Sequence, residues 1–377
     1  MVIHTVALSN LRNHGHSELV CARDVTILTG RNGAGKTSVL EAISMSALGR
    51  SFVPVPESAL VRHGAEMCSV TVVAERDRDV PYKVSIAYRE GMRKRIETSI
   101  GSNLTARDLI GELPIVALSP DHKSITFGAP SDRRAFIDAV MAQASKRVTD
   151  LLYEHRRLLK QRNALLAQCG GTMPPSSMMA AWTEALATCS AELVRRRRDF
   201  LKDFGPRVHR SYAEVSGAAE EIELRYEPDG IADVDNLTDD EIVSAMLAAA
   251  ERNAQQEVRR GLTLFGPQRD ELTFLINGGL VKETASQGQH KSLLVALKLA
   301  ECTILRDLRD ERPVVLLDDV FSELDRDRCA RVMKLILAMG MQCFVTTTDG
   351  DEIAALVPAG TDVRLVTVDG GTFKEAA

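Results

Sequence analysis

The stretch GRNGAGKT, residues 30–37, has the residue types and the spacing of a phosphate-binding loop. It matches the pattern G-x-x-x-x-G-K-[ST] at every fixed position. Glycines let backbone N–H groups turn towards phosphate oxygens, and the helix that should follow adds partial positive charge at its N-terminus. The Lys36 ammonium would reach the β- and γ-phosphates, and the Thr37 hydroxyl would reach a bound Mg²⁺. The predicted phosphate-binding residues are Gly30, Arg31, Asn32, Gly33, Ala34, Gly35, Lys36, Thr37 and Ser38.

A second candidate segment is PVVLLDDVFSELD, residues 313–325. Its apolar residues predict a buried parallel strand, and Asp318 follows at the carboxyl end, where ligands bind in open α/β sheets. A carboxylate there can join the Mg²⁺ shell, and Asp319 could polarise an attacking water. Two acidic residues after a strand are more often a turn or a helix cap, but the upstream glycine loop favours the catalytic interpretation. The predicted catalytic residues are Lys36, Asp318 and Asp319, and the predicted metal ligands are Thr37 and Asp318.

A third segment, SQGQHKSLL at residues 286–294, places polar residues and a glycine at the predicted start of a leucine-rich helix. The Ser286 hydroxyl, the Gly288 backbone and the helix dipole could together bind an anion. A chain with its own phosphate-binding loop needs no second phosphate-binding segment for the same nucleotide. We therefore expect Ser286, Gly288 and Gln289 to contact a nucleotide held by a second copy, in a homodimer packed head to tail.

The composition narrows the classes of protein to consider. The 377 residues leave room for two or more domains. Because 47 Lys and Arg oppose 52 Asp and Glu, the net charge is −5, and contact with DNA would have to be local. Aromatic residues reach only 4%, which argues against binding single strands by stacking. The seven cysteines include no C-x-x-C pair, so zinc is not expected and reduced thiols fit a cytoplasmic protein. No apolar run is long enough to predict a membrane span.

The hydrophobic pattern indicates an α/β domain interrupted by a mostly helical insertion. Strands are predicted at 2–8, 24–29, 68–74, 82–88, 93–100 and 115–118, with a helix at 37–48. Helices are predicted at 131–168 and 179–208, joined by a turn at 169–178, and at 239–259 after a strand at 222–226. Strands and helices then alternate at 272–276, 287–308, 313–317, 326–339 and 341–346. We expect residues 1–120 plus 261–377 to form one discontinuous lobe, and residues 121–260 to form a second lobe containing a short helical hairpin.

The order of these motifs resembles that of ABC-type ATPase heads. In such heads the S-x-G-Q segment is the signature motif, and the segment that matches SELD, residues 322–325, is the D-loop. Five further segments extend the resemblance, in order over nearly the whole chain, to the RecF family of bacterial recombination mediators. They are LSNLRNH (8–14), GRSF (49–52), SPDHKSITFGAPSDRRAFID (119–138), FGPQRDEL (265–272) and LLDDVFSELD (316–325).

The resemblance carries several implications. It implies an ABC-type P-loop ATPase head with a mixed sheet and a β-rich subdomain, split by the helical insertion. It implies ATP and Mg²⁺ as cofactors, an ATP-dependent homodimer and slow, DNA-stimulated hydrolysis. It also implies binding to double-stranded and gapped DNA, and cooperation with RecR and RecO in loading RecA during repair, replication and the SOS response. Asp325 would contact the partner across the dimer, and Arg12 and Asn13 would lie near the nucleotide.

The chain also departs from the pattern of such heads. It has Ser119-Pro120-Asp121 where ABC heads usually carry a glutamine, and Thr346, Thr347 and Thr348 where many have a histidine. Gln268 stands where the family would have a histidine. A slow ATPase is consistent with these changes. The alternatives are a nucleotide-gated scaffold without significant hydrolysis and a transporter motor subunit, for which the helical insertion is larger than needed.

Overall fold

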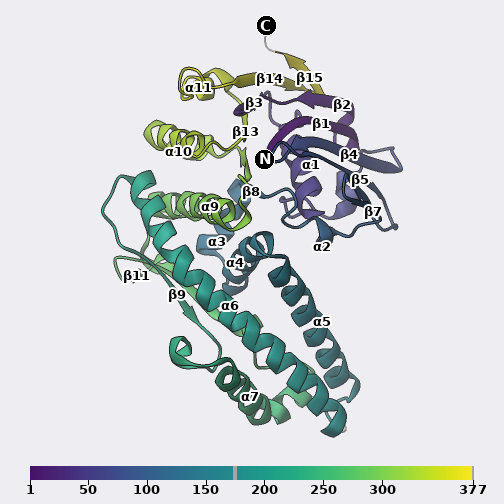
Figure 1. Cartoon of the computed structure of the whole chain (residues 1–377), viewed down its shortest axis with the longest axis vertical. Helices are drawn as coiled ribbons and strands as arrows, with labels where there is room; N and C mark the ends of the chain where they lie inside the picture. The colour runs from purple at the N-terminus through teal and green to yellow at the C-terminus, as the bar shows by residue number, and fades with distance from the viewer. Residues whose placement is uncertain (173–175, 376–377) are drawn as a thin grey trace. The chain divides into compact units, whose positions relative to one another are not determined.

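The computed structural model describes residues 1–172 and 176–375, and the chain divides into two compact units (Figure 1). Unit 1 comprises Met1–Lys123, Ser211–Ala218 and Lys291–Ala377, and unit 2 comprises Ser124–Arg210 and Ala219–His290. Residues 261–290, which the sequence analysis places with the first lobe, therefore fall in unit 2. The reason is that β10 (Glu271–Ile276) pairs along its whole length with β9 (Ile222–Glu227) of the insertion. Of the turn predicted at 169–178, residues 173–175 lie outside the described residues.

A mostly parallel sheet in unit 1 carries the candidate site on one edge. Its strand order is β15-β14-β3-β13-β12-β8. The pairing of β12 with β13 sets Asp318 beside Thr346, and the pairing of β13 with β3 sets Thr347 beside Thr29, so the carboxyl ends of these strands share one edge. The strands are β3 (Val25–Thr29), β8 (Ile115–Leu118), β12 (Val314–Asp318), β13 (Cys343–Thr347), β14 (Val363–Asp369) and β15 (Thr372–Glu375).

An antiparallel sheet forms the β-rich part of unit 1, in the order β2-β1-β4-β5-β6-β7. Helix α1 (Lys36–Leu48) packs against strands of both sheets, and eleven of its residues are buried, because it has apolar neighbours on nearly all sides. Burial in two directions explains why α1 has no polar face. The strands are β1 (Val2–Leu11), β2 (His14–Val20), β4 (Met67–Glu75), β5 (Pro81–Arg89), β6 (Arg95–Thr98) and β7 (Gly101–Ser102).

The remaining elements of unit 1 are helical. Helix α9 (Gln287–Arg309) belongs to this unit from Lys291 onward. The others are η1 (Glu57–Leu60), α2 (Ala106–Leu109), η2 (Pro120–Lys123), η5 (Phe321–Glu323), α10 (Arg326–Ala338) and α11 (Gly350–Ala354). None of the helices in the described ranges combines the length and apolar character needed to cross a bilayer.

Unit 2 is built mainly from long helices. The single helix predicted at 131–168 is wrong, because the chain breaks at Ser145, whose backbone is extended (φ −146°, ψ 120°). At this break the Thr149 hydroxyl donates to the Ala142 carbonyl over 2.8 Å and satisfies the end of the first helix. Helix α6 (Ser176–Ser216) is longer than predicted and continues through Pro206, and its residues from Ser211 onward belong to unit 1. The other elements are α3 (Ser124–Phe127), α4 (Pro130–Ala144), α5 (Lys146–Gln168), η3 (Val234–Asn236), α7 (Asp239–Arg260), η4 (Pro267–Arg269), β11 (Gly279–Leu280) and α8 (Val281–Thr284).

Buried charges hold the FGPQRDEL segment inside unit 2. The Arg197 guanidinium, 4% exposed, donates to Asp138 and to Asp270 over 2.9 Å each. Asp270 also accepts a hydrogen bond from the Tyr226 hydroxyl. Buried charges are tolerated only when they are paired in this way. The acidic residue of the FGPQRDEL segment therefore serves as a structural anchor in unit 2.

Candidate nucleotide-binding site

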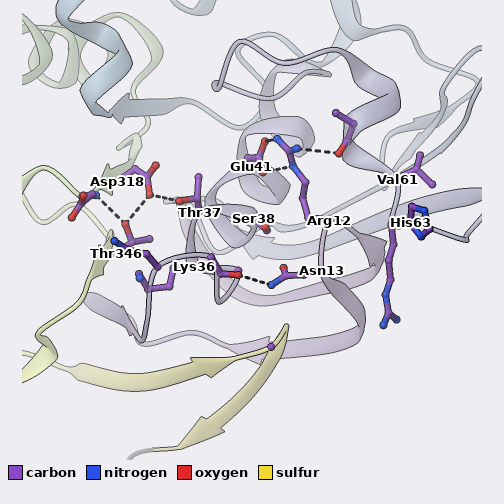
Figure 2. A pocket seen from close by; sticks show the side chains of 17 residues that line it. Arg12, Asn13, Lys36, Thr37, Ser38, Glu41, Val61, His63, Asp318 and Thr346 are labelled. Atoms are coloured by element: carbon purple, nitrogen blue, oxygen red, sulfur yellow. Dashed lines mark hydrogen bonds and ion pairs between the residues drawn. The ribbon is translucent and has the colours of Figure 1, made fainter.

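A pocket of about 980 Å³ in unit 1 collects most of the predicted site residues (Figure 2). It opens beside the glycine loop between β3 and α1, at the carboxyl edge of the parallel sheet. This edge is where an open α/β sheet binds its ligands. The predicted residues that line it are Arg12, Asn13, Asn32, Gly33, Gly35, Lys36, Thr37, Ser38, Asp318 and Asp319.

The loop needs its glycines for two different reasons. Gly30, Gly33 and Gly35 have φ angles of 145°, 78° and 110°, which side chains rarely permit. A Cβ at Gly30 would strike the Val368 carbonyl, and one at Gly35 would lie 2.5 Å from Asn13 Oδ1. Gly33 has open space around it and is required for its backbone angle alone. The result is a tight loop whose inner surface is backbone, which is the shape that cradles a phosphate.

The Lys36 ammonium lies inside this loop. Its Nζ donates to the carbonyls of Gly30 over 2.6 Å and of Arg31 over 3.1 Å. Burial lowers the pKa of Lys36, and the nearby carboxylates of Asp319 and Asp318 partly offset that effect. The loop thus holds a positive charge at its centre, which suits an anionic ligand.

Asp318 is held by two hydroxyl groups. Its Oδ1 accepts hydrogen bonds from Thr37 over 2.8 Å and from Thr346 over 2.7 Å. Burial raises the pKa of Asp318, the two hydroxyls oppose the rise, and Asp319 and Glu41 add to it. A carboxylate oxygen beside a threonine hydroxyl is the type of ligand that Mg²⁺ prefers. The residues therefore fit a divalent cation, whose charge would offset the desolvation of Asp318.

Asp319 and Asp325 occupy different settings. Asp319 is exposed at the pocket, with a left-handed backbone (φ 51°) fixed by its N–H, which donates to the Thr346 hydroxyl over 3.0 Å. Asp325 caps α10 instead, because its Oδ1 accepts the N–H of Arg328 over 2.9 Å, and this hydrogen bond lowers the pKa of Asp325. Asp325 does not line the pocket in the described part of the chain.

The SQGQ segment begins α9 in unit 2 as a capping box. The Ser286 N–H donates to Gln289 Oε1 over 2.7 Å, and the Gln289 N–H donates to Ser286 Oγ over 3.2 Å. This reciprocal pair satisfies the first N–H groups of a helix. Gln289 Nε2 also donates to the Glu220 carboxylate over 2.6 Å. The S-x-x-Q spacing thus has a local structural role, which the sequence analysis did not identify.

Arg12 is joined to residues that the sequence analysis missed. Its guanidinium donates to both oxygens of Glu41, over 2.7 and 3.0 Å, and to the Ala59 carbonyl over 3.0 Å (Figure 2). The Ser51 hydroxyl of the GRSF segment donates to the same carboxylate over 3.0 Å. Glu41 stands one helical turn after Thr37, and this spacing was the only signal that could have placed it here. The other unpredicted lining residues are Ala59, Val61, Arg62, His63 and Gly370.

The structure locates two of the departures from the usual pattern of ABC-type heads. Thr346 lines the pocket and bonds Asp318, whereas Asp121 is not part of the described pocket lining. The Ser119 N–H donates to His122 Nδ1 over 3.0 Å, so this segment is fixed locally.

The chain is similar in sequence to a family of known proteins. The protein-family model described as "RecF/RecN/SMC N terminal domain" matches residues 2–363. The "DNA replication and repair protein RecF" of Salinibacter ruber is 35% identical over 379 residues, covering 99% of this chain and 92% of that protein. Its namesake in Geobacter metallireducens is 34% identical over 357 residues, covering 93% of each chain.

Two solved structures are similar to the chain in fold. A structure of the "recombination mediator protein RecF-ATP in RecFOR pathway" has a TM-score of 0.90 at 26% identity, covering 100% of this chain and 98% of that one. An Smc head bound to the C-winged helix domain of ScpA has a TM-score of 0.59 at 16% identity, covering 100% and 97%, and shows likeness of fold alone.

The two sheets around α1, the glycine loop and the aspartate at the sheet edge define an ABC-type P-loop ATPase head. The two RecF relatives are similar to the chain over nearly their full lengths, and they show which family of such heads it belongs to. The chain belongs to the RecF family.

Proposed function

We propose that the protein is an ATP-dependent DNA-binding protein of DNA repair and replication, with unit 1 as its ATPase head. The observation that carries the proposal is the convergence of the glycine loop, the Lys36 ammonium and the Thr37–Asp318 pair in one pocket. A relative at 26% identity, described as RecF-ATP, supports ATP as the nucleotide.

The pocket residues have distinct proposed roles. The residues of the loop hold the phosphates, and Lys36 exchanges its two loop carbonyls for phosphate oxygens, because the ammonium is attracted more strongly to a negatively charged oxygen than to a neutral carbonyl. Thr37 and Asp318 hold Mg²⁺, which when bound neutralises charge on the β- and γ-phosphates. Asp319, exposed beside them, orients and activates the attacking water.

A second copy of the chain completes the proposed site. The Ser286 hydroxyl accepts the Gln289 N–H, so its own proton remains available to donate to a phosphate of the partner's nucleotide. The first N–H groups of α9 and its dipole add further attraction for an anion. ATP would therefore join two copies, with Asp325 contacting the partner. Cooperation with RecR and RecO in loading RecA at gaps belongs to the same proposal.

ATP should control DNA binding. We expect affinity for a gapped duplex to rise at least tenfold when ATP and Mg²⁺ are added, because two joined heads present more basic residues to phosphates than one. Binding should also weaken steeply as salt increases. Fluorescence anisotropy with a labelled gapped duplex measures both effects, and equal affinity with and without ATP would contradict the gating.

Asp319→Asn separates an ATPase from a nucleotide-gated scaffold. The position of Thr346, bonded to Asp318 where many heads have a histidine, is the observation that favours a scaffold. We expect the variant to lower steady-state ATP turnover at least tenfold and to keep ATP affinity within threefold, because the amide cannot accept a proton from water. Asp327→Asn, at an exposed position in α10, is the matched control and should leave turnover unchanged. Unchanged turnover in Asp319→Asn would support the scaffold.

A further inference from the structure

Three consecutive carbonyls of the glycine loop are held from outside the loop. The Gly33 carbonyl accepts the side-chain amide of Asn13 over 3.1 Å (Figure 2). The Ala34 carbonyl accepts the backbone N–H of Gly371 over 3.0 Å. The Gly35 carbonyl lies 3.0 Å from Nε2 of His14, which must donate here because a carbonyl only accepts.

Fixing a carbonyl also fixes the next N–H group. In a trans peptide the C=O of one residue and the N–H of the next point in opposite directions. Because the carbonyls of Ala34 and Gly35 point outward to their donors, the N–H groups of Gly35 and Lys36 point the opposite way, into the loop. The N–H of Ala34, set by the Gly33 carbonyl, closes the turn on Arg31 over 3.1 Å. The external donors thus set the direction of the groups that would meet a phosphate.

The donors come from two hairpins that are far apart in the sequence. Asn13 and His14 lie where β1 turns into β2, and Gly371 lies between β14 and β15. The two hairpins are joined directly, because the Ser17 hydroxyl lies 3.1 Å from His14 Nδ1 and donates to the Gly371 carbonyl over 2.6 Å. Phe373 packs against the His14 ring with centroids 5.4 Å apart.

Asn13, His14, Ser17 and Gly371 form a tightly packed cluster, which we call the brace. His14 is fully buried, and a Cβ at Gly371 would strike the Asn13 carbonyl and lie 2.9 Å from His14 Cα. The Asn13 amide can be oriented only one way, since the reverse would set its oxygen against the Gly33 carbonyl. The loop carbonyls nearer β3 have donors from the loop and the start of α1 instead: the Lys36 ammonium bonds those of Gly30 and Arg31, and the Ala34 N–H also bonds that of Arg31.

We infer that Asn13, His14 and the N–H of Gly371 are positioning groups for the proposed nucleotide site. His14 and Gly371 aim the N–H groups of Lys36 and Gly35 at the phosphates before ATP arrives, and Asn13 fixes the turn that precedes them. This inference rests on the proposed function. It changes the expected role of Asn13 from a nucleotide contact to a support for the loop. It also gives the β14–β15 hairpin a role in nucleotide affinity.

His14→Phe tests the brace, because phenylalanine keeps the packing against Phe373 and removes the donor. We expect ATP and ADP affinities to fall together by about tenfold, while the nucleotide-free protein still folds but melts at a lower temperature, because the Gly35 carbonyl loses its donor. His14→Gln should bind within threefold of the wild type, because its amide can donate to the Gly35 carbonyl. His16→Phe is the matched control, since His16 is exposed on the same hairpin, and it should bind as the wild type does.

A second variant covers the case in which His14→Phe fails to fold. Asn13→Leu removes only the donor to Gly33 and should also weaken ATP and ADP binding about tenfold. Wild-type affinity in the folded His14→Phe or Asn13→Leu protein overturns the inference, as does equal weakening by His14→Phe and His14→Gln. Titration of a fluorescent ATP analogue gives the affinities. If the wild type itself does not bind ATP, the proposed function fails, and the two failures are thereby distinguished.

Discussion

Replacing Lys36 by methionine should weaken ATP binding about a thousandfold, equivalent to about 4 kcal/mol. The ammonium is the charge at the centre of the loop, and it is the group that would form charge-assisted bonds with two phosphates. Methionine has a similar length and keeps the packing of this mostly buried side chain. Titration with a fluorescent ATP analogue measures the loss, and the melting temperature without nucleotide shows whether the fold persists.

A matched lysine provides the control for this variant. Lys83 is exposed on β5 of the same unit, and Lys83→Met removes one positive charge without touching the pocket. Its ATP affinity should equal that of the wild type. A folded Lys36→Met protein that binds ATP within tenfold of the wild type would show that the nucleotide lies elsewhere.

Ser286→Arg should leave ATP binding to the monomer within threefold and weaken ATP-dependent dimerisation at least a hundredfold. A guanidinium at the start of α9 would meet the Mg²⁺ and the γ-phosphate region of the partner's site, and a cation there also opposes the helix dipole. Sedimentation with and without ATP gives the dimer constant.

Two controls separate the causes of that effect. Ser286→Ala removes the hydroxyl of the capping box without adding bulk, at a cost to the helix of about 1 kcal/mol, and should weaken the dimer far less than arginine does. Gln287→Arg adds the same charge at the exposed neighbouring position and should still dimerise. If Ser286→Arg dimerises with ATP like the wild type, the nucleotide is not shared through this helix.

The sequence predicted the parts of the fold that have a strong local pattern. The strand predicted at 115–118 is β8 (Ile115–Leu118), and the helix predicted at 239–259 is α7 (Asp239–Arg260). Strand β2 (His14–Val20) was missed because its residues are mostly polar, and a polar segment does not read as a strand without its partner β1. The β14–β15 hairpin was also missed, although residues 363–369 alternate as strands do. Its partner β3 is more than 300 residues away in the sequence, so no local signal indicated the pairing.

The candidate site likewise has residues that could be predicted from the sequence and residues that could not. The glycine loop could be predicted because its chemistry needs adjacent residues. Asp318 meets the loop because β12 pairs with β13, and β13 pairs with β3, which leads into the loop. The supports of the loop could not be predicted, because their acceptors are backbone carbonyls, which carry no residue type. For the same reason the link from Gln289 to Glu220 depends on tertiary structure and has no pattern in the sequence.

The hairpin of β14 and β15 also has a consequence for biosynthesis. The ribosome makes Gly371, which holds the Ala34 carbonyl, more than 300 residues after the glycine loop. At roughly 5–20 residues per second, the nascent loop therefore waits on the order of tens of seconds for its last support. Once residue 325 has been made, the nascent chain contains every recognisable nucleotide motif but not yet the last support of the phosphate loop, so its full affinity for ATP should appear only after residue 371 has been made.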